Sequence, residues 1–229
     1  TVVRGLQPDR PRVRSRSCYL RLRLVKSVAS LLRPFVETAV SGIQGLLSNP
    51  YLELRPDDTL YLFETMGLLL GKTGLEAVDQ QLYLTQLMTP HVRSIETILA
   101  TPGLARDANH YGELLSGSIA AMAHLSKGFS KPQEEVQVIL VEMVNISLRV
   151  LEVLPMSDHV RNKSMVLLPR MIQCVGERVL PKIPQFLYLL IEHATADDIS
   201  FVSQLFNQIC IKFKEDAVSV IDGSLLPFL

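Results

Sequence analysis

The chain has 229 residues, of which 48% are apolar and 6% aromatic; none is tryptophan, and the formal net charge is zero. This aliphatic composition suits helix-on-helix packing. No apolar run approaches the about 20 residues of a membrane-spanning helix, so membrane insertion is not expected. The first ten residues lack the apolar stretch of a signal peptide. Three scattered cysteines, Cys18, Cys174 and Cys210, predict buried free thiols in a reducing compartment, not a disulfide scaffold.

The basic residues are distributed unevenly along the chain. Residues 1–33 contain nine basic side chains and one acid, Asp9, whereas the remainder contains 14 basic and 22 acidic residues. This asymmetry favours a basic patch for a polyanion beside an acidic body. A solvated helix face that follows a disordered start is the alternative interpretation.

Apolar residues recur with the helical period from one end of the chain to the other. In chain order, first helices are expected near residues 11–30, 57–72, 105–127, 157–177 and 197–215. Their partners are expected near residues 34–48, 75–101, 132–154, 179–194 and 217–229. Paired acids open three of these helices, where they stabilise the positive helix end: Asp57-Asp58, Glu134-Glu135 and Asp197-Asp198.

Consecutive helices form pairs, and no stretch shows sustained alternation of the strand type. The pairs lie near residues 11–48, 57–101, 105–154, 157–194 and 197–229, and their starts are separated by 46, 48, 52 and 40 residues. HEAT units run about 40–47 residues. The sequence therefore predicts an all-α fold, an α-α superhelix of about five HEAT-type antiparallel helix pairs within one continuous segment, 1–229. Both ends are expected to be cut from a longer array, because terminal repeats need a polar outer face.

Prolines mark the second helices. Pro34, Pro90 and Pro184 each precede an apolar helical stretch and would start or kink it. Because Pro90 falls inside the helix expected at 75–101, a kink or break is expected there.

No motif in the sequence carries catalytic or metal chemistry. Gly71-Lys72-Thr73 resembles the end of a phosphate-binding loop, but Gly67 lies too close upstream and no strand precedes it. Gly71 is instead expected to end a helix, and Ser116-Gly117-Ser118 to permit close helix packing. The five histidines lack metal-ligand spacing, and no nucleophile elbow occurs. We therefore expect no metal, no cofactor and no enzymatic activity.

The basic residues are the best functional candidates. Arginine and lysine neutralise phosphates without reading bases, and the chain shows no RNA-module signature with paired stacking aromatics. The candidate RNA-binding residues are Arg12, Arg14, Arg16, Lys26, Lys127, Lys131, Lys212 and Lys214. An alternative, strongest for Arg14 and Arg16, is that these side chains form ion pairs between neighbouring helix pairs.

Six segments in order resemble the tRNA exportin family of the importin-β (karyopherin) superfamily. They are RVRSRSCYLRLRLVKSV (12–28), LYLFETMGLLL (60–70), LMTPHV (87–92), LSKGFSKPQ (125–133), ERVLPKIPQFL (177–187) and NQICIKFK (207–214). The resemblance covers nearly all of the chain after residue 10, whereas residues 1–10 match nothing.

The resemblance implies a HEAT solenoid that wraps tRNA together with the GTP-bound small GTPase Ran. Such a receptor meets nuclear pore proteins, shuttles between nucleus and cytoplasm, and is expected to be a monomer. Family members are several times longer than this chain, so it would be a middle fragment. A HEAT scaffold for protein partners, from another karyopherin or an assembly subunit, is the alternative function.

Overall fold

The computed structural model describes residues 11–225, except for the side chains of residues 196, 197, 219, 223 and 225. Ten α-helices lie in that range: α1 (Pro11–Val28), α2 (Val36–Leu47), α3 (Pro56–Lys72), α4 (Ala77–Leu99), α5 (Ala108–Ser126), α6 (Glu134–Val153), α7 (Asp158–Val175), α8 (Ile183–Glu192), α9 (Ala196–Phe213) and α10 (Ala217–Leu225). Short 3-10 helices and turns connect them, which confirms the predicted all-α class. The predicted stretch 1–10 and the predicted helical residues 226–229 lie outside the described residues.

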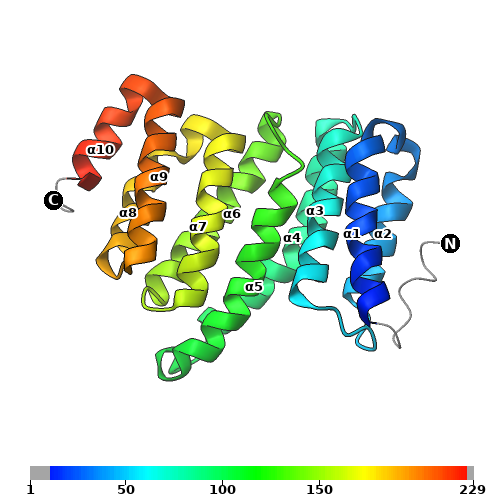
Figure 1. Cartoon of the computed structure of the whole chain (residues 1–229), viewed down its shortest axis with the longest axis horizontal. Coiled ribbons are helices and arrows are strands. Elements are labelled where there is room, and N and C mark those ends of the chain that lie inside the picture. The colour runs from blue at the N-terminus through cyan, green and yellow to red at the C-terminus, as the bar shows by residue number, and fades with distance from the viewer. Residues whose placement is uncertain (1–10, 226–229) are drawn as a thin grey trace.

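The helices stack in two layers. In one layer α1, α3, α5, α7 and α9 contact each other in order, and in the other α4, α6, α8 and α10 follow one another through contacts of α4 with α6, α6 with α8 and α8 with α10 (Figure 1). A single apolar core runs through the stack from Cys18 in α1 to Val220 in α10. The predicted superhelical stack of helix pairs is therefore confirmed, because each pair buries its apolar face against its neighbours.

Acids and hydroxyls at the first turn explain where the first helices begin. Asp58 accepts a hydrogen bond from the backbone N–H of Arg55 at the start of α3 (3.3 Å). At the start of α9, Thr195 and Asp198 form a capping box, in which each side chain accepts from the other residue's backbone N–H. These side chains satisfy helix N–H groups that would otherwise lack a partner.

Three local expectations from the sequence are wrong or only partly right. The helix containing Pro90 is not broken, since α4 continues through it to Leu99. Gly71 lies inside α3, and Gly74, with φ of 76°, follows the helix end instead. The partner helix expected at 179–194 is shorter, because Pro181 lies in a 3-10 segment (Gly176–Lys182) that precedes α8. Proline cannot donate the α-helical hydrogen bond.

Glycines bring α3 against the end of α5 at backbone distance. A methyl group added to Gly67 would overlap the carbonyl oxygen of Leu125, and one added to Gly128 would overlap the carbonyl oxygen of Gly67. A methyl group on Gly71 would meet the Gly128 carbonyl. We call Gly67, Gly71 and Gly128 the glycine contact. In Ser116-Gly117-Ser118, expected to permit close packing, the two serines are buried but Gly117 has open space around it, so the prediction is wrong for the glycine.

Two buried arginines connect one helix pair to the start of the next. Arg14 in α1 donates to the carbonyl of Glu53 (2.5 Å), just before α3. Arg161 in α7 donates to the carbonyl of His193, just before α9, and also pairs with Asp198 (2.5 Å). Each arginine is the fourth residue of its helix, so the same contact recurs at two boundaries between helix pairs. Buried arginine needs such partners, because an unpaired buried charge is costly.

Candidate nucleic-acid interface

The three arginines predicted on α1 have different surroundings. Arg14 is only 3% exposed and bonded to the Glu53 carbonyl, so the structure favours the alternative of a contact between helix pairs for this residue. Arg12 and Arg16 are exposed, and no ion pair involves either of them among the described residues. Of the three, only Arg12 and Arg16 present their charge to solvent.

Lys26 and Lys127 converge on one buried carboxylate. Glu64 in α3, whose side chain is 8% exposed, lies 2.5 Å from the Lys26 Nζ atom of α1 and 2.8 Å from the Lys127 Nζ atom after α5. The Nδ1 atom of His124 lies 3.3 Å from the same carboxylate. This Glu64 cluster (Lys26, Glu64, His124 and Lys127) joins three first helices, and its carboxylate neutralises part of the charge predicted to meet RNA.

The protonation of Glu64 follows from these contacts. Burial alone would raise the pKa of Glu64, but hydrogen bonds from His124, Lys127 and Lys26 outweigh burial and hold the pKa well below its usual range. The carboxylate is therefore charged at neutral pH and acts as the centre of the cluster.

Acid should weaken the fold through this carboxylate. The pKa of Glu64 is lower in the folded state than its ordinary value of 4.5, so its stabilising effect is complete above that value and is lost as the pH falls below it. We expect Glu64→Gln to remove part of the loss of unfolding free energy between about pH 6 and about pH 3. Denaturant unfolding at each pH measures the free energy of unfolding of the variant and of the unchanged chain.

Glu76→Gln is the matched control, because Glu76 makes an exposed pair with Arg33 and its side chain is 75% exposed. Its pH profile should follow that of the unchanged chain. If Glu64→Gln and Glu76→Gln gave the same profile, Glu64 would not be a stabilising centre.

A second group of basic residues surrounds the joint between α5 and α6, residues 127–133. Lys72, the last residue of α3, donates from Nζ to the Ser130 hydroxyl (2.6 Å). Lys131 is the next residue along the joint and is exposed. From α7, Arg170 donates to the carbonyls of Ser126 (3.0 Å) and Phe129. Arg170 thus caps the C-terminal end of α5 and holds the joint in place.

Lys212 brings the last repeat into this group. Burial raises the pKa of the Cys174 thiol in α7, whereas the nearby charges of Arg170, Lys212 and Lys72 act to lower it. These three cations come from three different helix pairs, and the charge of each acts on the same thiol. We call Lys72, Ser130, Lys131, Arg170 and Lys212 the joint cluster.

The structure thus brings together some of the predicted residues and adds others. Lys131 and Lys212 belong to the joint cluster, and Lys127 lies at its border but is paired with Glu64. Lys214, with φ of 49°, follows the end of α9 and is exposed.

Lys72 and Arg170 of the joint cluster were not predicted from the sequence. The spacing of Gly71-Lys72-Thr73 excluded a nucleotide loop and said nothing about the tertiary position of Lys72, and Arg170 lies in an apolar helical pattern that gives no signal.

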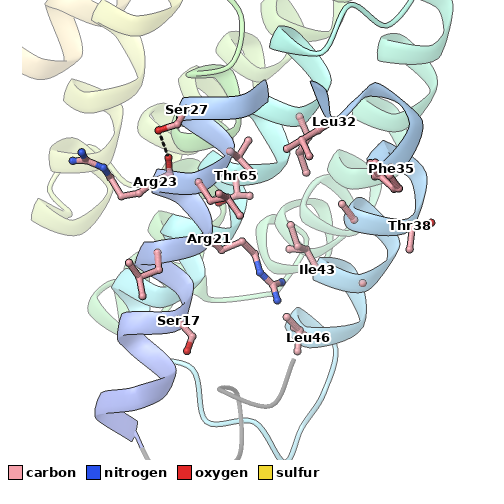
Figure 2. A pocket seen from close by; sticks show the side chains of 16 residues that line it. Ser17, Arg21, Arg23, Ser27, Leu32, Phe35, Thr38, Ile43, Leu46 and Thr65 are labelled. Atoms are coloured by element: carbon pink, nitrogen blue, oxygen red, sulfur yellow. Dashed lines mark hydrogen bonds between the residues drawn. The ribbon is translucent and has the colours of Figure 1, made fainter. Parts of the chain in front are cut away.

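An apolar groove of about 960 Å³ separates α1 from α2, with Thr65 and Leu69 of α3 among its lining residues. Figure 2 shows the Arg21 guanidinium directed from α1 into this groove. Burial lowers the pKa of Arg21, and no carboxylate pairs with it in the described part of the chain. Most of the other lining side chains are apolar, among them Leu20, Leu24, Phe35, Ile43 and Leu46.

Other kinds of site find no support within residues 11–225. The described residues contain no group of three or more histidine, cysteine or acidic side chains that could hold a metal ion. None of the described helices combines the length and the apolar character needed to cross a bilayer. Cys18 and Cys174 are buried as expected, but Cys210 in α9 is exposed, so the prediction of buried thiols is wrong for that residue.

A two-layer stack of antiparallel helix pairs is the architecture of HEAT-type repeat proteins. The family model described as Exportin-T matches residues 53–229. The chain belongs to the Exportin-T family. It is 30% identical to Exportin-T of Homo sapiens over 99% of this chain and 25% of that protein.

More distant relatives match in the same way. Exportin-T of Aspergillus niger is 28% identical over 95% of this chain and 24% of its own length. Exportin-T of Arabidopsis thaliana is 28% identical over 92% of this chain and 23% of its own length. The chain therefore spans about a quarter of the length of the curated relatives it matches.

Proposed function

We propose that this chain is a segment of a nuclear export receptor that binds tRNA cooperatively with Ran-GTP and carries it from nucleus to cytoplasm. Its membership of the Exportin-T family, by a match to residues 53–229, is the observation that carries the proposal. The segment performs no chemistry of its own and acts as a monomer that meets nuclear pore proteins during its passage.

The joint cluster supports the tRNA part of this proposal. It gathers cations that no carboxylate neutralises within the described residues, at an exposed bend between helices. Lysines at such a surface contact phosphates and carry little sequence information. A receptor that must accept many tRNAs needs contacts of this kind.

The decisive experiment uses a full-length exportin in which this chain replaces the matching quarter. We expect the chimera to retain tRNA on a column with Ran-GTP but not with Ran-GDP, and to lose it steeply between about 50 and about 200 mM salt. A chimera that folds but retains tRNA equally with either nucleotide state of Ran would contradict the proposal.

The groove between α1 and α2 favours a second candidate, a HEAT scaffold for protein partners. Largely apolar walls, with the Arg21 guanidinium directed between them, suit an amphipathic helix that carries a carboxylate. Under this alternative, Arg21→Ala would weaken protein binding, and the chimera would show no Ran-dependent retention of tRNA.

A further inference from the structure

No acid pairs with the cations of the joint cluster among the described residues, unlike three other bridging cations of the stack. Lys26 and Lys127 are held by Glu64, and Arg161 by Asp198. In the described part of the chain, no carboxylate lies within ion-pair distance of Lys72, Lys131 or Lys212. The joint therefore keeps a local positive charge that an incoming anion can neutralise.

Ser130 provides a hydrogen-bond donor at the centre of this charge. Its hydroxyl oxygen accepts from the Lys72 Nζ atom, 2.6 Å away. A hydroxyl can accept and donate at once, and its own proton has no acceptor among the described residues. The exposed Ser130 thus contacts Lys72 of α3 and directly precedes the exposed Lys131 in the joint.

The geometry of this position is fixed before any ligand arrives. Phe129 is 2% exposed and anchors the joint in the core, and Cys174 donates from Sγ to its carbonyl (3.1 Å). Arg170 of α7 donates to the same carbonyl, and the glycine contact packs the joint against α3. Because the loop is already ordered, binding an anion costs little conformational entropy.

We infer that the joint cluster is a preformed seat for one phosphate of an RNA backbone, contacted by Lys72, Ser130 and Lys131. Lys212 adds long-range charge, and Arg170 is a positioning residue, since its Nη2 atom donates to the carbonyls of Ser126 and Phe129. The ring of the joint's only aromatic residue, Phe129, is buried, so the seat offers no platform for base stacking. It reads the backbone and not the base.

The RNA identity of the ligand rests on the proposed function, whereas the anion seat itself rests on the contacts at the joint. We expect unfractionated tRNA, followed by fluorescence anisotropy, to bind the double variant Lys72→Gln/Lys131→Gln about tenfold more weakly at about 50 mM salt. The magnitude of the salt slope should fall by about 1 to 2. Ser130→Ala keeps both cations and should weaken binding less.

Arg106→Gln is the matched control, because Arg106 is an exposed cation beside the opposite end of α5. It should leave the affinity for tRNA close to that of the unchanged chain. Equal affinities of the double variant and Arg106→Gln would overturn the seat. Thermal unfolding by circular dichroism checks that the exposed substitutions leave the fold intact.

A second readout separates failure of the seat from failure of the proposed function. Inorganic phosphate titrated into the unchanged chain should shift the amide NMR signals of Ser130 and Lys131, and the double variant should abolish these shifts. If phosphate produced no shift, the seat would be wrong even if tRNA bound elsewhere. If a phosphoserine peptide bound the seat and tRNA did not, the assignment to RNA would be overturned. If the seat bound tRNA while the chimera showed no Ran-dependent retention, only the export function would fail.

Discussion

Replacing Gly128 by alanine should destabilise the chain by about 3 kcal/mol, since overpacked methyl groups in a fixed contact cost roughly 1–3 kcal/mol and occasionally more. The new methyl group would overlap the carbonyl oxygen of Gly67. Neither partner can move away alone, because both belong to backbone within one stacked core. Gly67→Ala, which meets the Leu125 carbonyl, should cost a similar amount. Urea unfolding measures both.

Gly117→Ala in α5 is the control for these substitutions. Gly117 has no atom within 4 Å of the added methyl group, and alanine is favoured over glycine inside a helix by about 1 kcal/mol. The control should therefore stabilise the chain slightly. If Gly128→Ala behaved like Gly117→Ala, helices α3 and α5 would not be in backbone contact at this position.

Removing the guanidinium of Arg161 should cost about 3–5 kcal/mol, the range for breaking a buried ion pair from one side. The Arg161 and Asp198 side chains are 5% and 7% exposed, so Arg161→Met leaves a buried carboxylate without its cation. The variant also removes the donor to the His193 carbonyl. Because both contacts lie at the start of α9, the last helix pair should unfold first, which hydrogen exchange can detect.

The exposed pair Arg178–Glu134 provides the comparison. Its side chains are 41% and 77% exposed, and Arg178→Met should cost about 0–1 kcal/mol, as expected for a surface pair. If Arg161→Met lowered the free energy of unfolding as little as Arg178→Met, Arg161 would not stabilise the packing of α9 on α7.

The sequence predicts the class of the fold because its signals are local. The apolar period, the first-turn acids such as Asp58 and Asp198, and the prolines act within one helix or one turn. The distance between helices, in contrast, is not set by any local signal. Gly67 and Gly128 are 61 positions apart, and nothing in either segment says that their backbones touch. Gly117 has the same residue type in a similar pattern and touches nothing.

The same distinction between local and long-range signals applies to the candidate site. Lys127 and Lys131 are visible in the sequence as charges flanking a bend, but their roles differ because Glu64 reaches one and not the other. Lys72 is 58 positions from its partner Ser130. Only the stacking of α3 on α5 joins them. Which lysine keeps its charge available for a ligand is therefore a property of the packed stack and not of the local sequence.

Arg170 sets a limit on the modularity of the array. It belongs to the fourth helix pair, yet it caps the end of α5 and the joint in the third. A truncation after Leu154 would retain every residue of the third pair and still remove the donor to Ser126 and Phe129. The unit that can be excised, swapped or recombined with its joint intact is thus longer than the sequence repeat, because its last hydrogen bonds are supplied by the neighbour.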